Sequence, residues 1–136
     1  MLCSYAVAAH ELYAQPRLHA VASVAPAGGG ANQLICRDLD GDGIRDMAFS
    51  VASGGTAGNM WWIALRRAGR GWRVVHVGNG YKLGLARSGA HDLVETQPVY
   101  GKNDPNCCPS GGFDHVRWRW NGSTLAAVRH WHTGSP

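Results

Sequence analysis

The nine residues from Asp38 to Asp46 carry the densest set of potential metal ligands in the chain. In a calcium-type loop, carboxylates at positions 1, 3 and 5 converge on one point, a glycine at position 6 allows a sharp turn, and the main-chain carbonyl of position 7 adds an oxygen. Position 9 binds directly or through water. In this sequence, positions 1, 3, 5, 6, 7 and 9 are Asp38, Asp40, Asp42, Gly43, Ile44 and Asp46.

This spacing predicts a calcium ion bound by Asp38, Asp40, Asp42, Ile44 and Asp46. Four carboxylates so close together would repel one another in a partly desolvated loop unless a cation neutralises them. Calcium is favoured over magnesium because the ligands are many, flexible and all from protein. The loop differs from an EF-hand, since Phe49 stands where position 12 requires a glutamate. The alternative is a plain hairpin, because turns rich in Gly and Asp also occur without a metal.

The four cysteines, Cys3, Cys36, Cys107 and Cys108, form an even set that indicates disulfides in an exported domain. We expect a bond between the adjacent Cys107 and Cys108 and a second bond between Cys3 and Cys36, while bonds from Cys36 to the adjacent pair remain an alternative. The spacing lacks the two CxxC pairs of a structural zinc site. Reduced thiols in a cytosolic protein, or a redox role for Cys107 and Cys108, are further alternatives.

Other residues suggest weaker alternatives. His130 and His132 lie at i, i+2 and could share one sheet face around a metal, and His76, His91 or His115 with an aspartate could support hydrolysis. Aromatic faces suit sugar rings, so exposed Trp61, Trp62, Trp118 and Trp131 could bind a glycan. We nevertheless expect no catalytic activity, because the one dense set of ionisable groups is the aspartate loop, and calcium would occupy it.

The net charge of +4 and the pI near 9.1 are mildly basic. The basic residues of the middle strands could attract an anionic surface, although a solvated face is the simpler interpretation; they are Arg66, Arg67, Arg70, Arg73, Lys82 and Arg87. No specific nucleic-acid motif occurs, and no apolar run approaches the roughly 18 residues of a membrane span. The partner is unknown, and a protein or a glycan outside the cytoplasm would fit.

The N-terminal residues 1–16 predict one short helix. Ser4 can cap it, Tyr5, Ala9 and Leu12 share a face, and Pro16 ends it. Residues 17–25 read as a possible strand, followed by a glycine-rich hinge at 26–30. Residues 17–136 are expected to form a single β-rich domain that contains the calcium loop at 38–46.

The rest of the chain shows β-type patterns. Strands are expected at 33–36, 47–52, 60–67, 72–77, 81–86, 92–100, 116–120 and 124–131. In the second of these, Met47, Phe49 and Val51 alternate with small residues, which indicates a half-buried strand. Asn121 and Gly122 predict a type I′ hairpin turn. The fold class is therefore mainly β (α+β), an antiparallel meander sheet with one short N-terminal helix.

Two segments of the chain resemble known families. The segment from Cys36 to Phe49, with its aspartate loop running into a strand, resembles the calcium loops of FG-GAP and VCBS-type repeats. Residues 103–112 around the paired cysteines, followed by 117–122, resemble the LppP/LprE family of exported bacterial lipoproteins. The second resemblance implies an exported β-rich domain of largely unassigned function. We therefore expect a secreted, periplasmic or cell-envelope protein in which calcium supports a structural or binding role.

Overall fold

The computed structural model describes residues 2–25 and 30–136, so most of the predicted hinge lies outside the described residues. Two four-stranded antiparallel sheets follow a short helical segment. The helices are α1 (Tyr5–Ala14), a 3₁₀ turn (Pro16–Leu18) and α2 (His19–Ala22). Sheet A contains β1 (Ala31–Arg37), β2 (Asp46–Ala52), β3 (Asn59–Ala68) and β4 (Gly71–Asn79), and sheet B contains β5 (Gly84–Ser88), β6 (Asp92–Pro98), β7 (Phe113–Trp120) and β8 (Leu125–Thr133).

The predicted meander is confirmed, since strands neighbour one another in chain order within each sheet. The meander is interrupted once, between β4 and β5, which produces two sheets in place of the single sheet expected. At this break Lys82 adopts a positive φ of 48°, and the N–H groups of Lys82 and Leu83 donate to the carbonyls of Ala57 and Asn59. These hydrogen bonds anchor the crossing segment to the β2–β3 loop, so the chain leaves sheet A before β5 begins.

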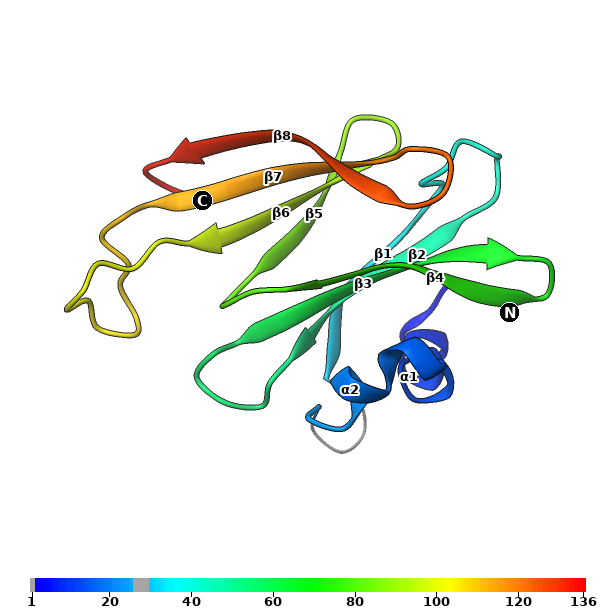
Figure 1. The fold of residues 1–136 in the computed structure, drawn as a ribbon, viewed down its shortest axis with the longest axis horizontal. Helices are drawn as coiled ribbons and strands as arrows, with labels where there is room; N and C mark the ends of the chain where they lie inside the picture. Colours follow the sequence, from blue (N-terminus) through cyan, green and yellow to red (C-terminus); the bar gives the residue numbers. More distant parts are fainter. Residues whose placement is uncertain (1, 26–29) are drawn as a thin grey trace.

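The molecule has three layers, with α1 and α2 on one face of sheet A and sheet B on the other (Figure 1). Met47, Phe49 and Val51 of β2 pack with helical residues such as Leu12, while Ala48 packs toward sheet B. All residues from Asp46 to Val51 are therefore buried. The prediction of a half-buried β2 was wrong, because the alternation of large and small residues reflects two different buried interfaces.

The helical segment is longer than predicted. Ser4 caps α1, as expected, by accepting the N–H of Val7 at 3.1 Å. The predicted apolar face is only partly correct, since Leu12 is fully buried whereas Tyr5 is 53% exposed. The strand expected at 17–25 was wrong: this segment forms the 3₁₀ turn and α2, whose Leu18 and Val21 complete the core beneath sheet A. None of the helices in the described residues is long and apolar enough to cross a membrane.

The last hairpin also differs from its prediction. Gly122 has a positive φ of 106°, but Asn121 does not, so the turn is not of type I′. Residues 121–124 form a four-residue loop closed by the N–H of Asn121 and the carbonyl of Thr124 at 2.9 Å. The Asn121 side chain accepts the N–H groups of Ser123 and Thr124, each at 3.0 Å. Asparagine acts here through its side chain rather than through a left-handed backbone.

The two expected disulfides are present: Cys3 bonds Cys36, and Cys107 bonds Cys108. The first joins residues separated by 33 positions and ties the start of α1 to β1. Closing a loop of this length restricts the unfolded chain strongly, whereas a bond between adjacent residues restricts it little. The first disulfide is therefore the one that contributes to stability.

Replacing both Cys3 and Cys36 by Ser should lower the free energy of unfolding by about 3–4 kcal/mol, from the lost loop-closure entropy. The matched control replaces both Cys107 and Cys108 by Ser and should cost much less. Urea unfolding followed by tryptophan fluorescence measures both changes. Equal losses for the two double variants would contradict this account.

A histidine lies inside the aromatic contact between the sheets. The His76 ring lies 4.2 Å from the Trp62 ring and 4.4 Å from the Trp118 ring, measured between centroids. Its Nε2 is buried without a hydrogen-bond partner. Burial, with a smaller contribution from the positive charge of Arg17, lowers the pKa of His76 to about 4. The folded protein therefore holds this ring neutral at pH values where an unfolded chain would protonate it.

Because the unfolded chain binds a proton at His76 between pH 6.5 and about 4 and the folded chain does not, this residue should lower stability as the pH falls through that window. The expected loss is about 1–3 kcal/mol. A His76→Phe variant keeps an aromatic ring but cannot titrate. Its stability should fall less than that of the wild type between pH 7 and pH 5 in urea unfolding. Since other groups titrate equally in both proteins, parallel pH profiles would refute the assignment.

Candidate metal centre

The loop from Asp38 to Asp46 connects β1 to β2 and is shaped by its own aspartates. The carboxylate of Asp38 accepts the N–H groups of Gly41 and Gly43, each at 2.8 Å, and that of Asp42 at 3.2 Å. Both glycines have a positive φ, 78° and 84°, which side chains disfavour. The loop therefore wraps around the Asp38 side chain.

Asp46, the first residue of β2, anchors the loop to sheet A. Its carboxylate is fully buried and accepts the N–H of Leu39 at 2.8 Å and the N–H of Arg67 at 2.9 Å. Burial raises the pKa of Asp46 to about 6, and the nearby charges of Asp40 and Asp42 act in the same direction, while the two N–H donors oppose them. Backbone N–H groups thus hold this carboxylate in place without cancelling its charge.

Arg66 of β3 reaches the loop from the neighbouring strand. Its Nε donates to the carboxylate of Asp40, and its Nη2 lies 3.7 Å from the carboxylate of Asp42. Burial opposes the ionisation of Asp40, but the hydrogen bond from Arg66, together with hydrogen bonds within the loop, outweighs it and lowers the pKa of Asp40 to about 2. The pKa of Arg66 is correspondingly raised. One guanidinium thus neutralises part of the negative charge.

The structure brings the four predicted aspartates together. Ligand oxygens of Asp38, Asp40, Asp42 and Asp46 all lie within 4.8 Å of one another. Clustered carboxylate oxygens suit a hard cation, so this group could hold a metal ion. The N–H of Ile44 donates to Asp42 at 2.8 Å, which places it in the same loop, while ligation through its carbonyl stays a prediction.

Sequence reasoning missed two neighbours of this loop. Arg66 is distant in sequence and arrives through the pairing of β2 with β3. His91 arrives in the β5–β6 turn, where its Nδ1 lies 2.6 Å from the carbonyl oxygen of Asp38. Arg37 fixes that turn by donating to the carbonyls of Gly89 at 2.8 Å and Asp92 at 3.1 Å. No local pattern in the sequence signals these contacts, because the first depends on the pairing of strands in sheet A and the second on how sheet B packs against the loop.

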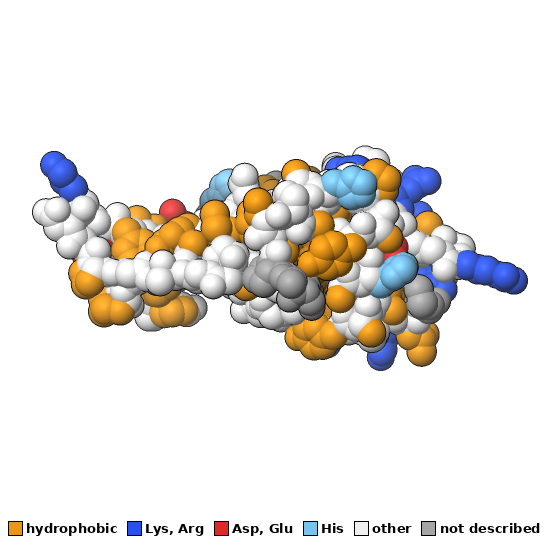
Figure 2. Space-filling model, turned by 90° about the horizontal axis from the view of Figure 1, so that it is seen from below, with side chains coloured by type: hydrophobic (Ala, Val, Ile, Leu, Met, Phe, Trp, Pro, Cys, Tyr) orange, Lys and Arg blue, Asp and Glu red, His pale blue; other side chains and the backbone are white. Residues whose placement is uncertain are grey.

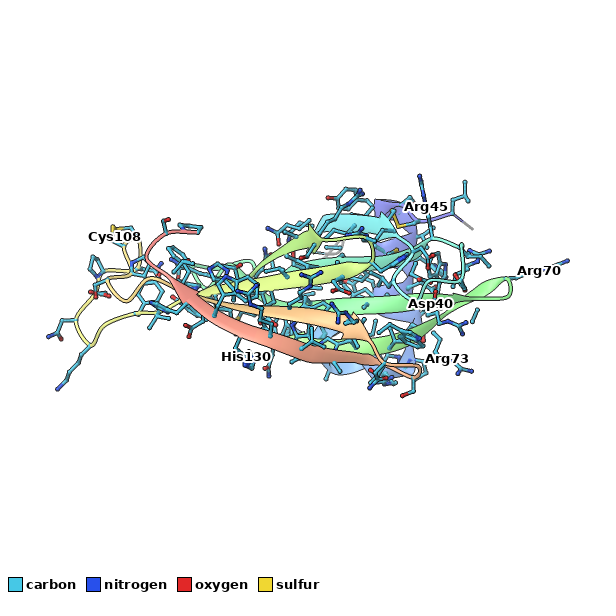
Figure 3. The ribbon with its side chains drawn as sticks, turned by 90° about the horizontal axis from the view of Figure 1, so that it is seen from above. Asp40, Arg45, Arg70, Arg73, Cys108 and His130 are labelled. Carbon is cyan, nitrogen blue, oxygen red and sulfur yellow. A yellow bond between two sulfur atoms is a disulfide. The ribbon has the colours of Figure 1, made fainter. Side chains whose placement is uncertain are left out.

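The loop and the adjacent cysteines lie at opposite ends of the molecule, as Asp40 and Cys108 show in Figure 3. Cys107 and Cys108 are exposed in the loop between β6 and β7. The Asp104 carboxylate closes this loop by accepting the N–H groups of Gly101 and Ser110, each at 2.6 Å, which lower its pKa. The adjacent disulfide therefore belongs to a separately organised loop.

The predicted basic group is divided between the same two ends. Arg70 and Arg73 lie near the end that carries Asp40 (Figure 3). Lys82 instead contacts the β6–β7 loop, where its Nζ donates to the hydroxyl of Tyr100 at 3.1 Å. On the face seen in Figure 2, Lys and Arg side chains likewise gather mainly at the two ends, with hydrophobic and His side chains between them. Lys82 therefore lies apart from Arg66, Arg70 and Arg73, which share the end of the molecule that carries Asp40 (Figure 3).

The histidines and tryptophans that the sequence singled out are not part of the aspartate loop, although His91 contacts it from the β5–β6 turn. His132 pairs with Asp114 at 2.7 Å, and the buried His115 contacts the hydroxyls of Thr96 and Thr133. Of the four tryptophans expected to be exposed, Trp62 is fully buried, which corrects that prediction. Its indole packs against Trp118 and His76, because the inner side of β3 faces sheet B.

Comparison with known proteins adds no further assignment. No family model, curated protein or solved structure matches the chain. Function must therefore be argued from the sites themselves rather than from a shared fold.

Proposed function

We propose that this chain is an exported calcium-binding β-domain with a structural or binding role. The observation that carries the proposal is the convergence of four aspartates, one of them fully buried at the start of β2. A divalent cation among these oxygens would offset the mutual repulsion of the four carboxylates. The ligand spacing and the all-oxygen donor set favour calcium.

The loop is also placed where an ion would affect the whole fold. Asp46 bonds both Leu39 in the loop and Arg67 on β3, so a cation held here would link the β1–β2 connection to the middle of sheet A. The nearby Cys3–Cys36 bond ends two residues before Asp38. An ion and a disulfide on one short segment are typical of domains stabilised outside the cytoplasm. We therefore include in the proposal a location outside the cytoplasm and the resemblance to exported lipoproteins.

Calcium should raise the melting temperature of the protein. At about 100 times its dissociation constant, a ligand adds about 2.7 kcal/mol to the free energy of unfolding. For a domain of this size that corresponds to about 5–15 °C. The shift between EDTA and millimolar calcium should vanish in Asp42→Asn. Asp104→Asn, a carboxylate at the opposite end that also accepts backbone N–H groups, is the matched control and should keep it.

Identical melting curves with EDTA and with calcium in the wild-type protein would reject the proposal. A shift produced equally by magnesium would retain a metal site but reject the preference for calcium. Scanning calorimetry with each ion distinguishes these results.

Arg66 should compete with the ion, because its guanidinium already occupies Asp40. We expect Arg66→Gln to melt at a lower temperature than the wild type in EDTA, since the carboxylates lose their positive partner. The same variant should bind calcium more tightly in isothermal titration. Arg73→Gln, at the cross-strand position opposite Arg66, removes the same charge without touching the loop and should change neither value. Weaker calcium binding by Arg66→Gln would contradict this competition.

A further inference from the structure

A second carboxylate lies at the centre of a cleft far from the aspartate loop in sequence. Two adjoining hollows, of about 540 Å³ and 630 Å³, share Glu95 of β6 as a lining residue. The smaller hollow lies at the free edge of β4 and includes Trp61, His76 and Trp118. The larger continues along sheet B past Asp114 and His130. We call these two hollows together the Glu95 cleft.

Glu95 is held by unusual partners for a buried acid. The residue is only 6% exposed, and its Oε1 accepts the indole N–H of Trp62 at 3.1 Å and that of Trp118 at 3.2 Å. Its Oε2 accepts the side-chain N–H of Gln97. All three partners are N–H donors, which is the pattern of an ionised carboxylate. Among the described residues, no ion pair to Glu95 is found.

The walls of the cleft would suit a positive group. Among the described residues, its lining includes two acids, Glu95 and Asp114, but no lysine or arginine, although the whole chain carries a net charge of +4. Asp114 lies beside His132. Arg17 brings a positive charge near His76, but its Nη1 donates to the carbonyl of Val74 at 2.8 Å and it lines neither hollow. A buried anion without a counter-charge is costly, so a cation entering the cleft would be favoured.

The aromatic groups of the cleft indicate which kind of cation it would bind. Trp61 and Trp118 line the smaller hollow, and indole faces attract ammonium groups and the methylene groups beside them. His76 adds a buried Nε2 without a partner on the same wall. A neutral imidazole nitrogen can accept a hydrogen bond. Because the Nε2 of His76 lacks a donor, the cleft favours an ammonium group that still carries N–H donors over one that is fully methylated.

We propose that the Glu95 cleft binds a small organic cation through its primary ammonium group. The ammonium charge pairs with Glu95, its N–H donors reach the carboxylate and His76, and its alkyl chain packs against Trp61 and Trp118. The cleft therefore constitutes a second binding site, independent of calcium in the aspartate loop. The low pKa of His76, which results from burial, keeps its ring available as an acceptor at neutral pH.

The test uses the whole protein with calcium present and butylammonium as the probe. In ¹⁵N-resolved NMR titrations, butylammonium should shift the indole N–H signals of Trp62 and Trp118. The indole of Trp72, which packs in the core beneath the helices, is an internal control and should not move. The neutral analogue 1-pentanol should bind at least about tenfold more weakly, since it lacks the charge that pairs with the acid.

Glu95→Gln should weaken butylammonium binding at least about tenfold. Glu11→Gln is the matched control, because Glu11 is also a buried glutamate, 7% exposed, but contacts Gln15 on the helical side.

Equal binding of 1-pentanol and butylammonium, or unshifted Trp62 and Trp118 signals in the wild type, would overturn the proposal. If chitobiose shifts these signals and butylammonium does not, the cleft is a glycan site and the proposal is wrong. If Glu95→Gln fails to fold, the titration of the wild-type protein still tests the proposal.

Discussion

Sheet A is buried on both faces, and the rest of the structure depends on this constraint. One face must match the helices and the other must match sheet B, so large residues such as Phe49 alternate with small ones such as Ala48 along β2. Acids are buried along these strands as well, at the start of β2, at the start of β6 and within β6. Each of these acids has a different set of hydrogen-bond partners, and the proposed chemistry follows from that difference.

Three buried acids illustrate this point. Asp92 at the start of β6 is paired with Arg117 at 2.6 Å and Arg119 at 3.0 Å, which outweigh the burial that opposes its ionisation and lower its pKa. Asp46 is held by backbone N–H donors, and Glu95 is held by two indoles and an amide. Hydrogen bonds stabilise a buried carboxylate but do not cancel its charge. Asp92 is thus neutralised by its two arginine partners, whereas Asp46 and Glu95 are the carboxylates on which the two proposals rest.

The two proposals differ in the kind of cation because the neighbours of the two carboxylates differ. Around Asp46 the neighbours are further carboxylates on a short glycine-containing loop, so many hard oxygens can surround one small ion. Around Glu95 the neighbours are aromatic rings and an imidazole, which offer flat polarisable surfaces and a single acceptor. The same electrostatic argument therefore underlies both proposals, a metal ion in one place and an organic ammonium in the other.

The sequence by itself determined the local features. The convergence of the aspartates from Asp38 to Asp46, the Ser4 helix cap and the antiparallel strand order were predicted, because each depends on residues close in sequence or on simple periodicity. The cysteine pairing was expected from the even number of cysteines and the adjacency of Cys107 and Cys108, which leaves Cys3 and Cys36 for each other. The predictions that the structure corrected concern segments whose local sequence pattern does not indicate the structure that they form. Residues 17–25 were interpreted as a possible strand but form helical turns, whose Leu18 and Val21 are buried against sheet A.

Only the tertiary structure decided the long-range contacts. The division into two sheets, the reach of Arg66 to Asp40, the position of His91 beside Asp38 and the meeting of Trp62, His76 and Trp118 around Glu95 all join residues from different strands or sheets. Strand periodicity tells which side of a strand a residue occupies, but not which surface it will face. That choice is made by the packing of whole sheets, which assembles the Glu95 cleft from residues distant in sequence and brings Arg66 and His91 to the aspartate loop.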